Sequence, residues 1–228
     1  MKQGLIWDYY QNEAPEFFAG SSARLRYLAK RVKSRGKVLN IGVGAGIFEE
    51  LAIQRGLDVY SLDPDEKAIA SLRQRLGMKE KAKVGFSQKI PFPDESFDAV
   101  VISEVIEHLS VDIIGKTMRE ISRVLFFGGR IIGTVPAREN LKDQLVVCPH
   151  CGEHFHRWGH IQSFDAERIN ALISLYFRIE EVSEHLFFNW SAMNWKGKVH
   201  GLITMLLYYV GVHGSNESIL FVATKPCE

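Results

Sequence analysis

Two carboxylates and an imidazole lie within five residues of each other in the stretch 104–108, Glu-Val-Ile-Glu-His. If this stretch is helical, its spacing places Glu104, Glu107 and His108 on one face. These groups could bind a divalent cation, which as a Lewis acid would lower the pKa of an acceptor hydroxyl. Without a metal, His108 could serve as a general base beside Glu104. The alternative is that Glu107 and His108 only pack and cap near a helix start.

A second set of metal-binding residue types lies at 147–160. Cys148 and Cys151, with a glycine after the second cysteine, have the spacing of a zinc knuckle. One zinc could be held by Cys148, Cys151, His156 and His160. Alternatively, the cysteines pair with His154 and His156, which leaves His160 as an active-site ligand or general base. A reduced loop without metal, its histidines lining an acceptor pocket, is the third interpretation.

A glycine-rich turn follows the apolar run 37–41, with glycines at 42, 44 and 46. Such a turn lets a ligand approach the backbone without interference from Cβ atoms. Asp63 ends the next apolar run, and a carboxylate there can accept hydrogen bonds from ribose hydroxyls. Dinucleotide enzymes use similar loops, and Asp63 could also be a simple cap before Pro64, so these features alone indicate only a nucleotide-like ligand.

Three blocks in order carry a more specific resemblance. Residues 38–46 resemble motif I of class I S-adenosylmethionine (SAM)-dependent methyltransferases, with Asp63 as the ribose-binding acid. Residues 90–101 resemble the "LPFPDxSFDxV" block of the type 11 methyltransferases, and residues 123–130 their "RVLKPGG" block. The resemblance covers roughly residues 36–136 and implies SAM as the cofactor. It implies cofactor contacts from Asn40, Gly42, Gly44, Gly46, Asp63, Phe86, Ser87 and Ser103.

The chain departs from the family at two places. Asn40 stands where the family usually has an acidic residue, so a negative charge near the cofactor's ammonium group is missing. Phe86 and Ser87 stand where the family often has Asp-Ala, so the adenine would meet these side chains instead of a carboxylate.

The 104–108 stretch also resembles the metal-binding "ExxEH" of small-RNA 2′-O-methyltransferases and of ubiquinone-biosynthesis O-methyltransferases. The later stretch 156–164 is similar to the histidine segment that completes the ligand set in the RNA enzymes, with His160 in the ligand's place. Many type 11 enzymes carry a similar motif and bind no metal. The resemblance therefore implies Glu104, Glu107, His108 and His160 as ligands without requiring them.

Short apolar runs alternate with amphipathic stretches, which is typical of βαβ units. We expect an α/β fold, a Rossmann-like seven-stranded mostly parallel sheet with helices on both faces. Residues 1–35 would form an N-terminal helical cap, and residues 36–228 a SAM-binding domain with a Cys/His-rich insertion at 137–162. The predicted strands are 37–41, 58–62, 83–86, 97–102, 130–135, 177–183 and 218–224.

Composition excludes several other classes of protein. The chain has 228 residues, enough for one full α/β domain, and its formal net charge of +1 gives no basic field to attract nucleic acid. The apolar stretch 201–212 is shorter than the ~18 residues of a membrane span. We expect it to be a buried or surface-packed helix; the alternative is a helix that covers the substrate or contacts a membrane surface. No signal-peptide pattern is present, and three cysteines indicate a reducing compartment, so we expect a cytoplasmic protein.

The predicted function is SAM-dependent O-methylation of a small-molecule acceptor, with zinc or another divalent cation as a second cofactor. An RNA 2′-O-methyltransferase is one rival, and it would need a basic groove. A non-catalytic SAM- or zinc-binding regulatory module is the other, favoured by Asn40, Phe86 and Ser87. The sequence indicates neither the acceptor nor the oligomeric state.

Overall fold

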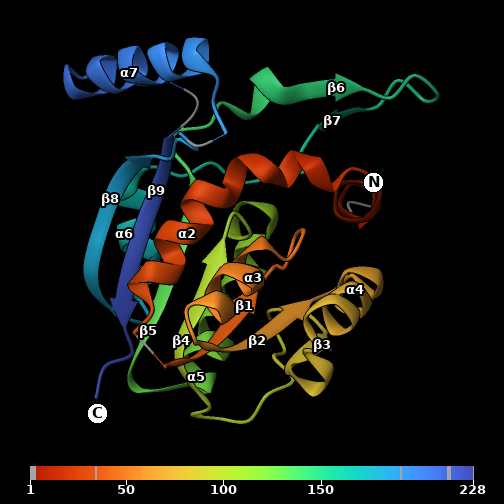
Figure 1. Ribbon diagram of the computed structural model, residues 1–228, viewed down its shortest axis with the longest axis vertical. Coiled ribbons are helices and arrows are strands. Elements are labelled where there is room, and N and C mark those ends of the chain that lie inside the picture. The colour runs from red at the N-terminus through yellow and green to blue at the C-terminus, as the bar shows by residue number, and fades with distance from the viewer. Residues whose placement is uncertain (1–3, 34, 191, 215–216, 228) are drawn as a thin grey trace.

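A seven-stranded sheet forms the centre of the computed structural model, which describes residues 4–33, 35–190, 192–214 and 217–227. The strand order is β3-β2-β1-β4-β5-β9-β8 (Figure 1). Strands β1 to β5 pair in parallel, and β9 runs antiparallel to both β5 and β8. The strands are β1 (Lys37–Ile41), β2 (Asp58–Asp63), β3 (Ala82–Val84), β4 (Phe97–Ser103), β5 (Leu125–Pro136), β8 (Arg178–Leu186) and β9 (Glu217–Thr224). The predicted fold class is confirmed.

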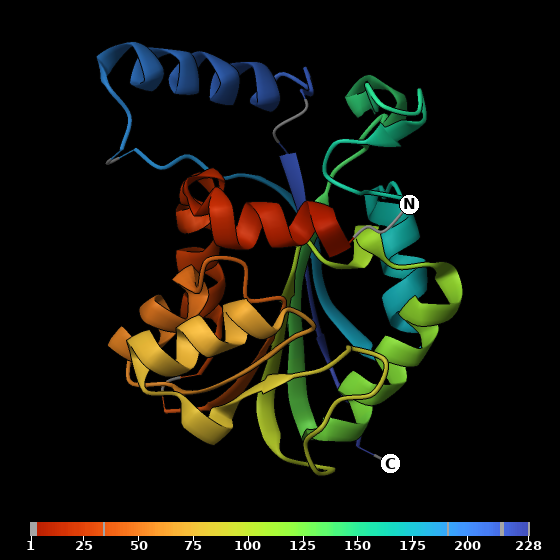
Figure 2. The same ribbon diagram turned by 90° about the vertical axis from the view of Figure 1, so that its right-hand side faces the viewer.

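Helices cover both faces of the sheet, with α2, α3 and α4 on one face and α5 and α6 on the other (Figure 2). The α-helices are α1 (Gly4–Asp8), α2 (Ser22–Arg31), α3 (Ile47–Gln54), α4 (Glu66–Leu76), α5 (Val111–Val124), α6 (Ala166–Ser174) and α7 (Trp195–Tyr209). Shorter helical turns are Tyr9–Glu13, Pro15–Ser21, Lys79–Lys81, Ile106–His108 and Leu141–Gln144.

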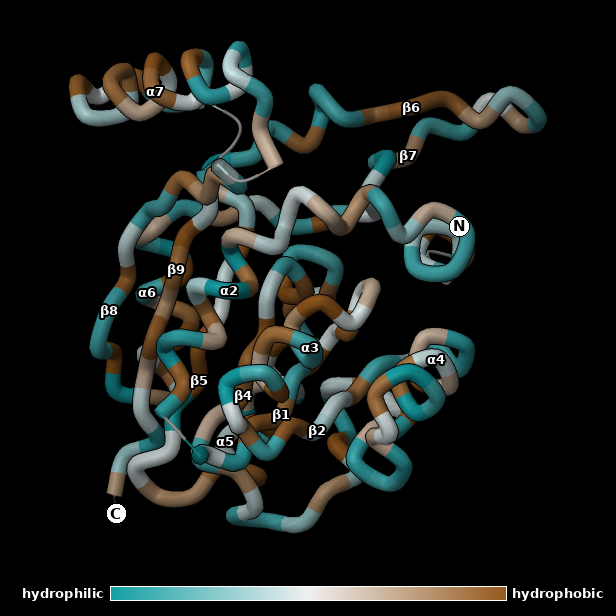
Figure 3. Tube along the Cα trace, in the orientation of Figure 1, coloured by the Kyte–Doolittle hydropathy of each residue, from teal (hydrophilic) through white to brown (hydrophobic). Residues whose placement is uncertain are grey.

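The packing of the core explains why the sequences of the central strands are continuous apolar runs. Along β4, Val100 and Ile102 pack on the α5/α6 side, while Ala99 and Val101 pack on the α2–α4 side. Alternate side chains of a strand point to opposite faces, so a strand covered on both faces is apolar at most of its positions. Figure 3 shows this hydrophobic colour along β9, every residue of which is buried.

Two segments differ from the predicted elements. Strand β5 begins at Leu125, ahead of the glycines expected to precede it, because Leu125 already pairs with Phe97 of β4. The insertion 137–162 showed no periodicity, yet it contains a two-stranded antiparallel hairpin of β6 (Leu145–Val147) and β7 (His154–His156). A strand pair this short carries too few side chains to produce a detectable period.

The apolar stretch 201–212 lies mostly in α7, where Gly201 is the buried residue among those described. Of the two expected placements, buried or surface-packed, the structure shows a helix on the surface. No helix within the described ranges is long and apolar enough to cross a membrane.

Candidate functional site

A cavity of about 780 Å³ opens at the carboxyl ends of β1, β2 and β4. This is the edge at which open α/β sheets bind their ligands. The glycine turn after β1 and the end of β2 line it. Glu104, His108 and His160 also line it, as do Trp7, Tyr10 and Arg24 of the N-terminal helices.

The glycine turn is held in a conformation that only glycine adopts easily. Gly42, Gly44 and Gly46 all have positive φ values, of 85°, 51° and 79°. A Cβ on Gly42 would lie 2.6 Å from a methyl carbon of Val105, and one on Gly46 would lie 2.6 Å from Leu72. Both positions therefore exclude a side chain by backbone strain and by contact. Gly42 and Gly44 line the cavity, and Gly46 does not.

Asp63 lies at the end of β2 with only 3% of its surface exposed. Its carboxylate accepts hydrogen bonds from the backbone N–H of Val43 (2.9 Å) and Asp65 (2.9 Å), and from the side-chain amide of Gln11 (3.1 Å). Burial raises the pKa of this carboxyl above its usual value. Asp63 thus ties the glycine turn to β2, and the Gln11 contact occupies part of the hydrogen-bonding capacity that a ribose would use.

Asn40 shares its surroundings with a buried carboxyl group that the sequence reading missed. The Asn40 Nδ2 donates to Glu49 Oε1 (2.8 Å) and to the Gly42 carbonyl (3.2 Å), and Ser61 Oγ also donates to Glu49 Oε1 (2.7 Å). Burial raises the pKa of Glu49 to about 7. The acidic group absent at position 40 is therefore present next to it, contributed by α3 instead of β1.

The remaining predicted cofactor residues also line the cavity. Phe86 exposes 60% of its surface there, and Ser87 is buried with its hydroxyl 2.8 Å from that of Thr117. Ser103 is 2.8 Å from the Thr134 hydroxyl and accepts a hydrogen bond from Arg24 Nε at 3.2 Å. The Arg24 guanidinium also approaches Glu104 at 3.8 Å.

The stretch 104–108 is not an α-helix. Glu104 has φ of 55°, in the left-handed region, and a single 3₁₀ turn, Ile106–His108, follows. The expectation of one shared helical face is therefore wrong. Ligand atoms of Glu107, His108 and His160 nevertheless lie within 4.8 Å of one another, and Glu104 lies outside this group. We refer to Glu107, His108 and His160 as the Glu–His cluster.

Glu107 is 1% exposed, and neither of its carboxylate oxygens has a hydrogen-bond partner. Its own backbone carbonyl accepts the N–H groups of Ile161 and Gln162, so the insertion is docked directly over it. Burial, and then the charge of Glu104, raises the pKa of Glu107 well above its usual value. A buried carboxyl without partners is strongly unfavourable, and a cation is the ligand that would satisfy it.

Both histidines of the cluster are oriented through their Nδ1 atoms. The Nδ1 of His108 donates to the Gly159 carbonyl (3.1 Å), which leaves its buried Nε2 without a partner and 3.9 Å from Glu107 Oε1. The Nδ1 of His160 contacts Glu139 Oε2. Burial, and then the neighbouring His160, lowers the pKa of His108 to about 3, so its ring is neutral. A neutral imidazole whose Nδ1–H is held by an acceptor is the usual state of a metal-ligating histidine.

Glu139 lies between two histidines and was not predicted. Besides its contact with His160, its Oε1 is 3.4 Å from His156 Nε2. The Nδ1 of His156 accepts the backbone N–H groups of Trp158 (3.3 Å) and His160 (3.1 Å), which places its remaining proton on Nε2, toward Glu139. Ligand atoms of Glu139, His156 and His160 also lie within 4.8 Å of one another.

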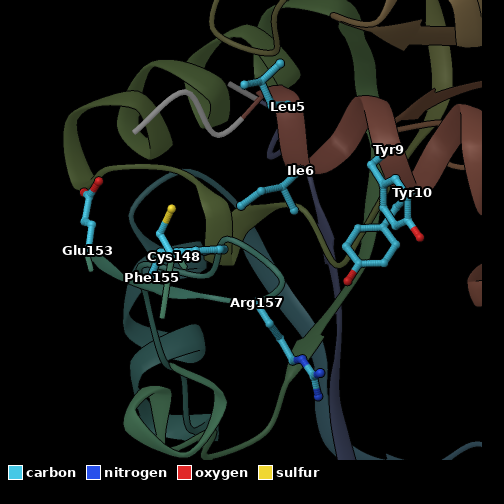
Figure 4. Close-up of a pocket in the computed structure, with 8 residues that line it drawn as sticks. All are labelled: Leu5, Ile6, Tyr9, Tyr10, Cys148, Glu153, Phe155 and Arg157. Carbon is cyan, nitrogen blue, oxygen red and sulfur yellow. The ribbon is translucent and has the colours of Figure 1, made fainter. Parts of the chain in front are cut away.

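The cysteine pair lies apart from this cluster. Cys148 and Cys151 are free thiols, and within the described ranges no group of three potential metal ligands includes either of them. Cys148 faces a smaller cavity of about 380 Å³ between the hairpin and the N-terminal helix. Figure 4 shows it beside Phe155 and Glu153, across from Leu5 and Ile6. The structure therefore does not bring Cys148, Cys151, His156 and His160 into one ligand set, and His154 is exposed.

Arg24, Gln11, Glu49 and Glu139 are the site residues that sequence reasoning missed. Each reaches the site from a segment whose position over the cavity depends on tertiary packing. None carries a local sequence signal that distinguishes it from an ordinary surface residue.

Comparison with known proteins agrees with this geometry. Residues 39–133 match the family model described as "Methyltransferase domain". A probable S-adenosylmethionine-dependent methyltransferase of Mycobacterium tuberculosis is 35% identical over 111 residues, which cover 49% of this chain and 39% of that protein. A ubiquinone biosynthesis O-methyltransferase of Agrobacterium fabrum is 33% identical over 108 residues, covering 45% and 43%.

The chain spans between 37% and 57% of the length of the curated relatives it matches. A solved SAM-dependent methyltransferase from Archaeoglobus fulgidus has the same fold, with a TM-score of 0.66 at 18% identity. That match covers 99% of this chain and 100% of the other.

Proposed function

We propose that this chain is a SAM-dependent methyltransferase that methylates an oxygen of a small-molecule acceptor, assisted by a divalent cation bound at the Glu–His cluster. One observation carries the proposal. The cavity that is lined by the glycine turn and Asp63 is also lined by His108, whose buried Nε2 has no partner and lies 3.9 Å from the equally partnerless carboxyl group of Glu107. The glycine turn and Asp63 suit a nucleoside cofactor, and the Glu–His cluster suits a cation.

The cofactor assignment rests on the turn and on the family match at residues 39–133. The positive-φ glycines allow close backbone approach, and Asp63 is placed to accept hydrogen bonds from the ribose once Gln11 releases its oxygen. Asn40 and Glu49 lie behind the turn, where the cofactor's ammonium group would need acceptors. The volume of about 780 Å³ falls within the roughly 300–1,000 Å³ of small-molecule sites.

The cation assignment rests on the chemistry of the donor set. Glu107 offers a carboxylate without partners, and His108 and His160 each have Nδ1 engaged, so that Nε2 is the nitrogen left to accept. Imidazole and carboxylate together suit zinc, manganese or iron. When bound, the cation would act as a Lewis acid that lowers the pKa of an acceptor hydroxyl.

The protein's own side chains would then hold the acceptor in line with the methyl group. Effective alignment is the main requirement, because the sulfonium already activates the methyl carbon. Arg24 lies against Ser103 and Glu104 at the end of β4, so it can fix the position of Glu104 at the reaction centre. Trp158 packs against Tyr10 with ring centroids 4.8 Å apart, and both line the cavity, which excludes water from that side.

Isothermal titration with S-adenosylhomocysteine tests the cofactor assignment. We expect binding at sub-millimolar concentration. No binding at that concentration would overturn the enzyme assignment. Binding without methyl transfer to any hydroxylated acceptor pool would support a regulatory module instead.

Metal analysis tests the cation assignment independently of the cofactor assignment. After dialysis against zinc and then buffer, the wild-type protein should retain zinc, the His160→Ala variant should lose it, and Cys148→Ser should keep it. His200→Ala, which removes an exposed histidine far from the cluster, is the matched control. Zinc lost only in the cysteine variant would place the ion in the knuckle and refute the Glu–His cluster.

A further inference from the structure

Helix α7 stands at the carboxyl edge of the sheet, between the end of β8 and the start of β9, and it extends beyond the rest of the molecule (Figure 1, Figure 2). Hydrophobic colour runs along most of its length in Figure 3. Of its described residues, Gly201 is the buried one. A helix this apolar is normally covered, so its exposure needs an explanation.

The inner side of α7 makes the contacts with the protein body. Gly201 lies so close to the Trp190 ring that a Cβ there would be 3.0 Å from it. Tyr208 Oη donates to the Glu184 carbonyl at 3.0 Å. With 3.6 residues per turn, Gly197, Gly201, Met205 and Tyr208 share this inner side. It consists largely of small or polar groups.

The outer side carries the large aliphatic residues. Val199, Ile203, Leu206 and Val210 follow one another at helical spacing, and Leu206 and Val210 expose 67% and 75% of their surfaces. Leu202 flanks them and is also exposed. The amphipathicity is therefore inverted with respect to a helix that packs its apolar face on a core.

The charged side chains of α7 itself are lysines. Between residues 185 and 216 the sequence contains no aspartate or glutamate, whereas Lys196 and Lys198 are both exposed in the first turn of the helix. Lysine is disfavoured at a helix N-terminus, where the helix dipole is positive. These lysines therefore do not stabilise the helix, and an external anionic surface would be complementary to their charge.

We propose that α7 docks the protein in the plane of an anionic lipid bilayer. The outer aliphatic face would lie at the boundary of headgroups and acyl chains, with Lys196 and Lys198 facing lipid phosphates. Trp195 and Tyr209, at the two ends of the helix, have the apolar ring and polar tip that suit the membrane interface. A second copy of the chain fits less well, because the same face offers no carboxylate to pair with the lysines.

This docking does not depend on methyl transfer, but it has a consequence for it. The cavity opens at the same edge of the sheet from which α7 extends. Docking would therefore hold that edge toward the bilayer.

Vesicle co-sedimentation with the full chain tests the proposal. We expect the protein to sediment with vesicles of phosphatidylcholine and phosphatidylglycerol and far less with phosphatidylcholine alone. Leu206→Glu should weaken binding by at least about tenfold. The double variant Lys196→Glu/Lys198→Glu should weaken binding to the anionic vesicles by roughly thirtyfold or more, since each lysine near an anionic surface is worth about 1 kcal/mol.

Leu175→Glu is the matched control, because Leu175 exposes 74% of its surface at the end of α6. It should bind vesicles like the wild type, and all variants should keep their affinity for S-adenosylhomocysteine and their circular dichroism spectrum. Equal vesicle binding by wild type and Leu206→Glu would overturn the proposal, as would no binding by the wild type. A dimer that Leu206→Glu dissociates would assign the face to a second copy and also overturn it.

Discussion

The buried carboxyl groups around the glycine turn and that of the Glu–His cluster differ in their hydrogen-bond partners. Around the turn, Asp63 accepts hydrogen bonds from Val43, Asp65 and Gln11, and Glu49 accepts two through one oxygen while its other oxygen has no partner. In the Glu–His cluster, Glu107 is equally buried and accepts none. The hydrogen bonds of Asp63 therefore hold the turn in shape whether or not a ligand is bound.

The difference indicates where the protein depends on a bound group. A satisfied carboxylate stabilises the fold, whereas a buried one without partners destabilises it until a ligand arrives. Substitutions of Asp63 and of Glu107 should therefore have opposite effects on the stability of the metal-free protein.

Glu49 should give the largest effect. Its pKa is raised to about 7 from an unfolded value of 4.5, so the folded state binds the proton more tightly. The free energy of unfolding should consequently fall by about 3 kcal/mol as the pH rises from below 4.5 to above 7. Glu49→Gln should remove most of this slope, as measured by urea unfolding across that pH range. An unchanged slope would show that Glu49 is not the titrating group.

Glu107→Met should have two effects of opposite sign. Without metal, the variant should be more stable than the wild type by about 1–3 kcal/mol, because a buried carboxyl without partners is removed. With zinc at a hundred times its Kd, the wild type should gain about 2.7 kcal/mol and the variant nothing. Thermal unfolding with chelator and with zinc measures both. A metal-free variant less stable than the wild type would contradict the contrast between Glu107 and Asp63.

Asp63→Ala should weaken S-adenosylhomocysteine binding by about 1–3 kcal/mol and also destabilise the metal-free protein, because Val43 and Asp65 lose their acceptor. Glu66→Ala, an exposed change in the first turn of α4, is the control. Titration calorimetry and unfolding measure the two effects, and unaltered affinity would refute the ribose assignment.

Glu139→Gln should have the smallest effect. Its contact with His160 Nδ1 orients that ring, and loss of a partner of this kind typically weakens metal binding 10- to 100-fold. We expect about tenfold, the lower end, because the amide oxygen can still accept the Nδ1–H. Competition with a zinc indicator measures the change. Cofactor affinity should stay unchanged, and a loss there instead would indicate a general structural effect.

The sequence predicted the residues whose roles are encoded locally. Gly42 and Asp63 follow directly from the strands that precede them, so the motif already fixed their positions at the carboxyl edge. Glu107, His108 and His160 were predicted as ligands from the resemblance, and the shared helical face considered for Glu107 and His108 does not form, because the backbone at Glu104 is left-handed. Their proximity arises instead from the insertion, whose backbone bonds to the Glu107 carbonyl.

Glu139 and Gln11 could not be predicted for the same reason. Each reaches the site only because a segment without periodicity packs across the cavity. The sequence left open whether the helix at 201–212 is buried or lies on the surface, since a run of aliphatic residues has the same composition on a surface as in a core.

An anomalous difference map at the zinc absorption edge, from crystals grown with zinc and S-adenosylhomocysteine, tests the central claim most directly. The account predicts a peak in contact with Glu107, His108 and His160, and the nucleoside beside Asp63. A peak at Cys148 and Cys151 with none at Glu107, or a nucleoside bound away from the glycine turn, would contradict it.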